Sequence, residues 1–222
     1  MSNVCKLFLT AMTQDLRKLD TVATCKVLTT RGERILDAAQ QLFFEHGYDE
    51  TSLQMIINKT GGSRRSIYNE FGNKKGLLVA VIQRQVYFQT ETLNAIDRSL
   101  SASDCLNDVC FRFVKGMCSP EIRSLFRLVV QQTVKHPELG EMIYQSGPIM
   151  GVKPLEDYLI ELNEKRILVI DDCHFAARFL LEMAKGPLYT NLLLLPQKQA
   201  SDEEIKEQIN IAVKVFIKSH CA

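Results

Sequence analysis

The chain has 222 residues, of which 46% are hydrophobic and 24% are charged, and its formal net charge at pH 7 is +1. These values are ordinary for a globular protein with enough apolar side chains for a sizeable core. No apolar run approaches the roughly 18 residues of a membrane-spanning helix. Charged residues from Asp15 to Asp20 interrupt the short apolar groups near the N-terminus too early for a signal peptide. We therefore expect a cytoplasmic protein with no membrane partner.

The charges are unevenly distributed along the chain. Residues 1–84 hold 12 Lys and Arg against 8 Asp and Glu, whereas the remaining residues hold 15 against 18. A basic N-terminal part on an acidic body is typical of a nucleic-acid-binding surface at one end, although the asymmetry is mild. The seven cysteines include no C-x-x-C pair and no zinc spacing. We expect free thiols in a reducing compartment, no metal site and no cofactor.

The first elements are an irregular segment and one helix. Residues 1–29 show no periodic pattern, so we expect this N-terminal extension to be poorly ordered. A helix is predicted from Thr30, because Thr30 and Glu33 have the spacing of a capping box and apolar residues follow at helical spacing. Gly47 is suited to the C-terminal cap of this helix.

Two short helices joined by a tight turn are predicted between Thr51 and Lys75. Thr51 and Gln54 form a second candidate capping box, followed by a short apolar stripe. Gly61 and Gly62 break the helix, and a glycine can adopt the positive φ that a sharp turn needs. Ser63 is a good N-cap for the second helix, which leaves a basic, hydroxyl-rich face outside. A short helix of this kind fits the major groove of DNA.

Residues 30–84 resemble the DNA-binding domain of the TetR family of bacterial transcriptional regulators. The resemblance rests on many positions at fixed spacing: Ile35-Leu36-Asp37-Ala38-Ala39, Leu42-Phe43, Gly47-Tyr48, Thr51, Ile56, Gly61, Ser63, Ile67-Tyr68, Phe71, Lys74 and Leu77-Leu78. Two positions depart from the family pattern. Gly62 replaces a branched apolar residue, and Arg65 replaces a small residue, so the second helix carries an extra positive charge.

The second helix carries candidates for contacts with both bases and phosphates. Arg64 and Arg65 can each form a bidentate pair with guanine, worth about 1–3 kcal/mol of discrimination. Asn69 suits either adenine or the rim of the interface. The resemblance implies that Thr51, Tyr68 and Lys74 contact the DNA backbone. The full set of predicted DNA-binding residues is Thr51, Ser63, Arg64, Arg65, Ser66, Tyr68, Asn69 and Lys74.

The rest of the chain is also predicted to be helical, which gives an all-α fold of about nine helices. A long helix runs from Asn73 to about Leu100, and the lysines in its first turn favour a bound phosphate there. Further helices begin near Ser103, Ser119, Pro137 and Pro154, and two long helices span 172–195 and 201–218. We place the domain boundary at residue 80: residues 30–80 form the helix-turn-helix domain and residues 81–222 the effector-binding and dimerisation domain.

The second domain is similar to that of the AefR-like regulators between Phe126 and Leu195, including His136-Pro137-Glu138-Leu139 and Ala176-Ala177-Arg178-Phe179. The two resemblances imply a helical sensing domain and a homodimer formed through the last two helices. The predicted interface residues are Phe179, Met183, Leu188, Ile209, Val213 and Phe216. An apolar pocket would suit a hydrophobic or amphipathic effector. Its candidate lining residues are Phe88, Phe113, Met117, Phe126, Met142, Tyr144 and Tyr158.

The sequence therefore predicts a dimeric regulator that binds a palindromic operator in double-stranded DNA, and most simply a repressor released by a small-molecule effector. An alternative is a redox or electrophile sensor switched through Cys105, Cys110 or Cys118, which requires an accessible thiol with a lowered pKa. An enzyme is disfavoured, because the sequence has no nucleophile–base spacing, no catalytic residues and no cofactor loop. The apolar run 167–170 with Asp171 and Asp172 is interpreted as a connector that ends in a helix cap.

Overall fold

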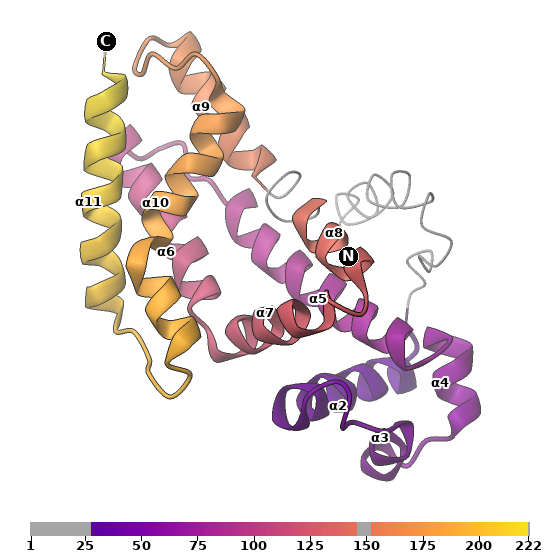
Figure 1. Ribbon diagram of the computed structural model, residues 1–222. Helices are drawn as coiled ribbons and strands as arrows, with labels where there is room; N and C mark the ends of the chain where they lie inside the picture. Colours follow the sequence, from indigo (N-terminus) through magenta and orange to yellow (C-terminus); the bar gives the residue numbers. More distant parts are fainter. Residues whose placement is uncertain (1–27, 146–151, 222) are drawn as a thin grey trace. The chain divides into compact units, whose positions relative to one another are not determined.

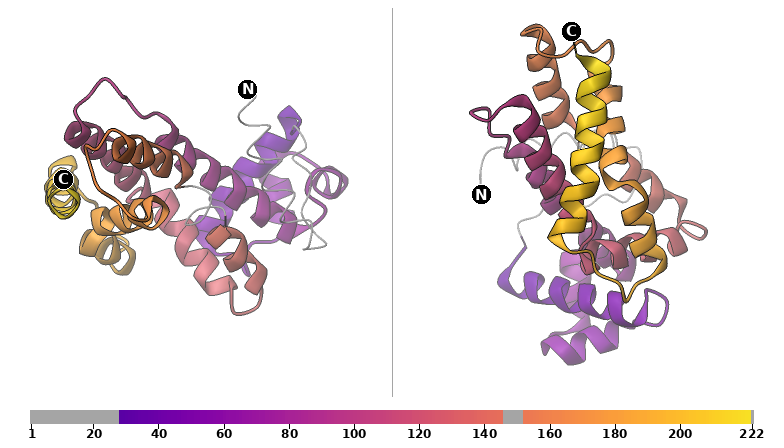
Figure 2. Two further views of the ribbon diagram at one scale, coloured as in Figure 1. Left: turned by 90° about the horizontal axis from the view of Figure 1, so that it is seen from above. Right: turned by 90° about the vertical axis from the view of Figure 1, so that its left-hand side faces the viewer.

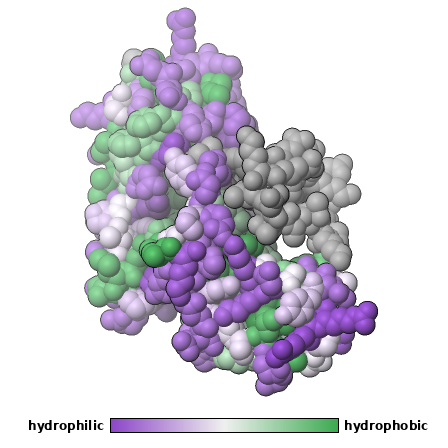
Figure 3. Space-filling model, turned by 45° about the vertical axis from the view of Figure 1, so that its right-hand side comes forward, coloured by the Kyte–Doolittle hydropathy of each residue, from purple (hydrophilic) through white to green (hydrophobic). Residues whose placement is uncertain are grey.

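The computed structural model describes residues 28–145 and 152–221 (Figure 1). Within these ranges the secondary structure consists of ten α-helices and no β-strand, which confirms the expected all-α fold. Almost all of the predicted N-terminal extension, residues 1–29, lies outside the described residues. No helix in the described ranges is long and apolar enough to cross a membrane. Hydrophilic side chains cover most of the face drawn in Figure 3.

The described residues form two compact units. Unit 1 contains residues 28–84 and 128–145, and unit 2 contains residues 85–127 and 152–221. The first break, between Arg84 and Gln85, lies close to the predicted boundary at residue 80. The predicted division into 30–80 and 81–222 nevertheless differs from the structure, because residues 128–145 pack with unit 1.

Unit 1 contains α2 (Thr30–His46), α3 (Leu53–Thr60), α4 (Arg64–Phe71), α8 (Pro137–Tyr144) and the first half of α5 (Lys74–Asn94). The helices α2, α3 and α4 pack against one another. Their inward side chains are fully or almost fully buried, together with those at the start of α5: Ile35, Ala39, Phe43, Ile56, Ile67, Leu77 and Leu78. The apolar face of α4 packs against this small core, and the opposite face of α4 is exposed to solvent.

Two helices of unit 1 begin one residue away from their predicted caps. The cap of α2 is Thr29, whose side chain accepts a hydrogen bond from the Gly32 N–H at 3.0 Å. The cap of α3 is Ser52, whose side chain accepts from the Met55 N–H at 3.2 Å. Both caps have extended backbone dihedrals, which an N-cap requires. The predicted capping boxes at Thr30 and Thr51 are therefore wrong, although each helix was placed correctly.

Unit 2 contains α6 (Ala102–Met117), α9 (Lys153–Glu164), α10 (Cys173–Leu194), α11 (Asp202–His220) and the first part of α7 (Pro120–Gln132). The helix α10 packs against α6, α9 and α11, and α11 also packs against α6. Figures 1 and 2 show α10 and α11 side by side. One apolar core joins these helices and includes Leu106, Val109, Leu155, Leu180, Ile209, Val213 and Phe216.

One long predicted helix is shorter in the structure. The helix α5 ends at Asn94 and not at Leu100. After it, Asp97 accepts hydrogen bonds from the backbone N–H of Ser99 at 2.9 Å and from its hydroxyl at 2.6 Å. This local turn competes with helical hydrogen bonding. The helices predicted to begin near Pro137 and Pro154 correspond to α8 and α9, and residues 146–151 between them lie outside the described residues.

The helix α10 contains a sharp bend at Gly186 and Pro187. Gly186 has φ 47° and ψ −157°, which is not a helical conformation. Pro187 lacks the N–H group that would otherwise bond to the Met183 carbonyl. The side-chain amide of Gln208, on α11, donates to that carbonyl instead at 3.2 Å. The bend is therefore stabilised by a hydrogen bond from the neighbouring helix.

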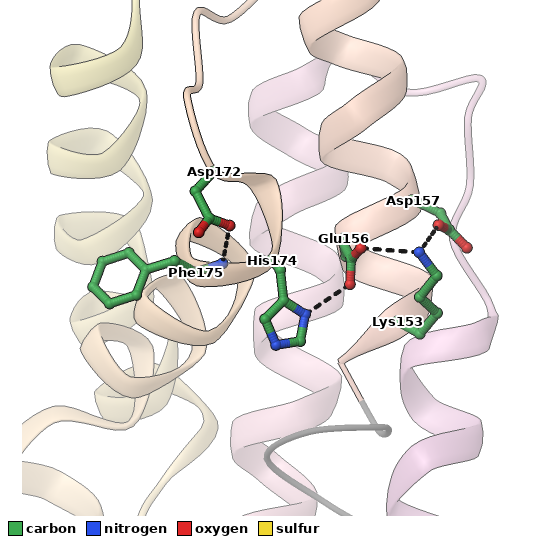
Figure 4. A network of polar contacts seen from close by, with 6 residues as sticks. All are labelled: Lys153, Glu156, Asp157, Asp172, His174 and Phe175. Carbon is green, nitrogen blue, oxygen red and sulfur yellow. Dashed lines mark hydrogen bonds and ion pairs between the residues drawn. The ribbon is translucent and has the colours of Figure 1, made fainter.

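The segment before α10 is a connector, as predicted, and Asp172 caps the helix by accepting from the Phe175 N–H at 2.8 Å. Beside this cap, the carboxylate of Glu156 lies 2.8 Å from His174 Nδ1 and 2.9 Å from Lys153 Nζ (Figure 4). Burial by itself would raise the pKa of Glu156, but the hydrogen bonds with His174 and Lys153 outweigh it and lower the pKa. This network joins α9 to the start of α10.

Candidate nucleic-acid interface

A tight turn connects α3 and α4. Gly61 adopts the left-handed conformation, with φ 66°, and its N–H bonds to the Ile57 carbonyl at 2.9 Å. Glycine tolerates this conformation because it has no Cβ atom. Ser63 caps α4, as predicted, by accepting from the Ser66 N–H at 3.2 Å. The hydroxyl oxygens of Ser63 and Ser66 lie 3.1 Å apart, so these two predicted DNA-binding residues meet at the first turn of α4.

The helix α4 has one apolar face and one polar face. Ile67 and Phe71 are buried and form the apolar face. Within α4 the exposed predicted contacts are Arg64, Arg65, Tyr68 and Asn69, and the N-cap Ser63 is exposed as well. Residues three and four positions apart are neighbours on a helix surface, so these side chains form one contiguous face. No hydrogen-bond or ion-pair partner occupies either arginine among the described residues. Both guanidinium groups are therefore free to meet bases or phosphates.

Thr51 does not belong to this exposed face. Its side chain is 0% exposed, and its hydroxyl lies 2.8 Å from the Gly47 carbonyl oxygen and 3.1 Å from the Leu42 carbonyl oxygen. These contacts join the C-terminal end of α2 to the segment that leads into α3. The burial of Thr51 contradicts its predicted contact with the DNA backbone. Its observed role is to hold the two helices together.

Lys74 occupies a half-buried position beside the loop between α2 and α3. Its Nζ donates to the Asp49 carbonyl at 3.2 Å and lies 4.4 Å from the centroid of the Tyr48 ring. Burial lowers the pKa of Lys74, and the charges of Asp49 and Glu50 partly offset this effect. The contact with the Asp49 carbonyl uses one of three ammonium N–H groups, which leaves two for a phosphate oxygen.

The first turn of α5 differs in one respect from the prediction. Asn73 caps the helix, as expected, by accepting from the Gly76 N–H at 2.8 Å. The positive charge of Lys75, however, is paired with the carboxylate of Glu138 on α8. This ion pair explains a lysine in the first turn without a bound phosphate.

Residues 128–145 contact the loop that precedes α3. Lys135 Nζ lies 2.8 Å from a carboxylate oxygen of Asp49, and the rings of His136 and Tyr48 meet edge to face with centroids 6.4 Å apart. The hydrogen bond with Lys135 is the main cause of the lowered pKa of Asp49. Sequence reasoning missed this contact, because 86 positions separate Lys135 from Asp49 and no helical spacing relates them.

The start of α2 lies beside α4. The Thr29 hydroxyl donates to a carboxylate oxygen of Glu70 at 2.8 Å. Arg31, two residues further along α2, is exposed. The N-terminal end of α2 thus carries an exposed positive side chain, and its cap residue is bonded to α4.

The predicted effector-pocket residues are divided between the two units. Met142 and Tyr144 belong to unit 1, and the other five belong to unit 2. Tyr158 and Met142 are buried, whereas Phe88, Phe126 and Tyr144 are exposed. Within unit 2, the exposed rings of Phe88 and Phe126 do not line an enclosed site.

The thiols named in the alternative prediction are all buried. Burial raises the pKa of Cys105 and Cys118, and it raises the pKa of Cys110 to about 12. A reactive thiol needs the opposite shift. Among the described residues, no group of three His, Cys, Asp or Glu side chains could hold a metal ion.

The predicted dimer residues fall into two groups. Ile209, Val213 and Phe216 are buried in the core of unit 2, so they are not available to a second protomer and their prediction as interface residues is wrong. They were selected because they form the apolar stripe of α11, and that stripe packs against α6 and α10. Phe179 is 50% exposed, and Met183 and Leu188 are half-buried.

The capped helix α3, the glycine turn and the exposed basic face of α4 define a helix-turn-helix DNA-binding domain. Residues 35–81 match the family described as bacterial regulatory proteins of the TetR family. Residues 104–221 match the C-terminal domain of the AefR-like transcriptional repressors. The chain belongs to the TetR family of DNA-binding transcriptional regulators and has an AefR-like C-terminal domain.

Individual relatives support this assignment over different lengths. The transcriptional repressor ComR of Escherichia coli is 45% identical over 51 residues, which cover 23% of this chain and 24% of ComR. A TetR-family regulator structure from Mesorhizobium loti covers 88% of this chain and 100% of its own, with a TM-score of 0.78 and 20% identity. The flavonoid-responsive regulator FrrA has a TM-score of 0.73 and 26% identity, and the match covers 86% of this chain and 97% of FrrA.

Proposed function

We propose that this regulator is a homodimeric repressor that binds a palindromic operator and is released from it by a small-molecule effector. The observation that carries the proposal is the exposed face of α4, on which Arg64 and Arg65 have no partner among the described residues. Arg64 and Arg65 would read base edges, and Ser63, Ser66, Tyr68, Asn69 and Lys74 would set the position of α4 on the duplex. We propose no enzymatic activity, because the family that the chain matches consists of transcriptional regulators.

A homodimer is supported by exposed apolar side chains on α10 and α11. Phe175 and Phe179 stack on each other, with ring centroids 5.8 Å apart, and both are at least half exposed. On the adjacent helix, Ile211 and Val215 are also more than half exposed. Exposed apolar side chains on two neighbouring helices are typical of a protein–protein interface. A two-fold axis at this surface would give paired recognition helices for the two halves of a palindrome.

The effector is proposed to bind in unit 2, which holds most of the AefR-like domain. FrrA, by its name, responds to a flavonoid, and the match between FrrA and this chain includes most of both chains. An amphipathic aromatic effector is therefore the class that we propose. A thiol switch is the weaker candidate, because burial raises the pKa of Cys105, Cys110 and Cys118.

The experiment that tests operator reading starts with selection of bound sequences from a random double-stranded DNA library at a stated salt concentration. Arg64→Ala is then compared with the parent protein on the selected site and on all single-base variants of that site. We expect a loss of affinity of about 1–3 kcal/mol and relaxed discrimination at one position of each half-site. Arg166→Ala removes an exposed arginine from unit 2 and should leave operator affinity and base discrimination unchanged. Unchanged discrimination in Arg64→Ala would refute this assignment.

A further inference from the structure

The helix α7 carries an arginine that is enclosed in unit 2. Arg123 is 1% exposed, and one of its terminal nitrogens, Nη1, donates to the Leu192 carbonyl at 2.8 Å. Leu192 lies in the last turn of α10, where carbonyl groups have no partner within the helix. The Nε of Arg123 is buried and has no hydrogen-bond partner. The Nη1 group of Arg123 thus stabilises the end of α10, and its Nε–H group has no acceptor among the described residues.

A second arginine lies one helical turn further along α7. Arg127 Nη2 lies 3.2 Å from the hydroxyl oxygen of Ser124, while its Nη1 is buried without a partner. No carboxylate of the described residues 28–145 and 152–221 forms an ion pair with Arg123 or Arg127. Arg123 is thus a buried positive charge and Arg127 a half-buried one, and neither has a counterion among these residues.

Tyr189 on α10 completes the cluster. Its hydroxyl is buried and has no hydrogen-bond partner, and its ring meets that of Phe126 edge to face with centroids 6.1 Å apart. Burial is the main cause of its raised pKa, Cys118 and Glu182 raise it further, and the charges of Arg127 and Arg123 act in the opposite direction. Phe126, next to Arg127 on α7, contacts the Tyr189 ring, and the Leu192 carbonyl that accepts from Arg123 lies three residues after Tyr189, so the three side chains come from facing parts of α7 and α10. Lys185 Nζ, 5.4 Å from the centroid of the Tyr189 ring, adds a third positive charge and is paired with Glu182.

Arg123, Arg127 and Tyr189 each offer an unused hydrogen-bond donor. Arg123 Nε, Arg127 Nη1 and the Tyr189 hydroxyl are all hydrogen-bond donors, and the arginines are cationic. A buried charge without a partner is costly, and an apolar side chain of similar volume would avoid that cost. A ligand with negatively charged oxygen atoms would satisfy the donors and balance the charge. The rings of Phe126 and Tyr189 supply apolar surface beside that group.

We infer that Arg123, Arg127 and Tyr189 form a binding site for an oxyanion, either a carboxylate or a phosphate group, and that this group is the polar end of the effector. The second part rests on the effector-controlled regulator proposed above. The first part does not depend on it, since binding of an anion to unit 2 can be measured without DNA.

The test uses the full-length protein and three probes at constant ionic strength and pH 7: benzoate, inorganic phosphate, and benzamide as the neutral counterpart of benzoate. Binding is followed by calorimetry and by the thermal unfolding midpoint. Benzoate or phosphate should bind and benzamide should not, and the responding anion distinguishes a carboxylate site from a phosphate site. Arg127→Met should weaken the binding about tenfold or more, because it removes a charge-assisted hydrogen bond. The surface control Arg166→Met should bind like the parent protein.

Arg123→Met is a second variant in the same site and should also weaken binding of the anion. If Arg123→Met fails to fold, Arg127→Met still tests the site, because its side chain is less buried. Failure of both anions to bind, or equal binding by the parent protein and Arg127→Met, would overturn the oxyanion site. Operator binding is measured separately with and without the responding anion. An anion that binds through Arg127 without changing operator affinity would uphold the site and refute its role as the effector site.

Discussion

The buried hydroxyl of Thr51 gives a direct test of how the helix-turn-helix is held together. Thr51→Val replaces the hydroxyl by a methyl group of similar size at a side chain with 0% exposure. The hydroxyl proton is shared between the carbonyl oxygens of Gly47, at 2.8 Å, and Leu42, at 3.1 Å. Loss of this hydrogen bond with a carbonyl left unsatisfied should cost about 1–3 kcal/mol of unfolding free energy. In a chain of this length each kcal/mol lowers the unfolding midpoint by about 2–4 °C.

The assay is thermal and denaturant unfolding, with operator affinity measured on the same samples well below the unfolding midpoint. Thr51→Ser keeps the hydroxyl and serves as the matched control, so it should lose much less stability than Thr51→Val. If Thr51→Val unfolds like the parent protein but binds the operator weakly, then Thr51 contacts DNA and the argument from its burial is wrong.

Three further predictions concern unit 2. Gly186→Ala should destabilise the protein by more than about 1 kcal/mol in denaturant unfolding, because φ 47° is strained for alanine and the new Cβ would displace the Gln208 side chain. A midpoint at or above that of the parent would contradict this. Glu156→Gln should lower the unfolding free energy at pH 7. Because the pKa of Glu156 is lowered in the folded state, the difference in unfolding free energy from the parent should shrink as the pH falls below about 4.5 and through the folded pKa. A difference that stays constant from pH 7 to pH 3 would refute the role of the Glu156 charge. Phe179→Asp should raise the dissociation constant of the proposed dimer about 30-fold or more, measured by analytical ultracentrifugation. Val134→Asp, at an exposed site in unit 1, should leave it unchanged. A Phe179→Asp protein that dimerises like the parent would exclude this surface.

The sequence predicted the helix-turn-helix well because its signals are local. Gly47, Gly61, Ser63 and Asn73 each end or begin a helix as expected, since backbone conformation and capping depend on residues only a few positions apart. The errors are equally local in origin. Where two adjacent residues both carry hydroxyl groups, as at Ser52, composition does not show which one adopts the extended backbone of a cap.

The orientation of helices in unit 2 was harder to predict because several helices have apolar residues on more than one face. The stripe of α11 that includes Ile209 and Phe216 was assigned to the dimer, yet it is buried in the core of its own unit. The exposed apolar positions Ile211 and Val215 lie on another face of the same helix. A periodic pattern shows that a face is apolar, but its partner depends on which helices are neighbours in the fold.

The arginines of α7 show why average charge hides a site of this kind. The chain after residue 84 has 15 basic against 18 acidic residues, which predicts no attraction for an anion. Much of the acidic charge, however, is engaged at the surface in pairs such as Arg98–Glu161 and Lys115–Asp202. A local signal was present, because neither Arg123 nor Arg127 has an acidic residue three or four positions away on its own helix. On α7, moreover, Phe126 is exposed whereas Arg123 is buried. An arginine that lies on the inward face of a helix without an acidic neighbour is therefore evidence for a ligand, since the energy of burying its charge must be recovered from a group outside the helix.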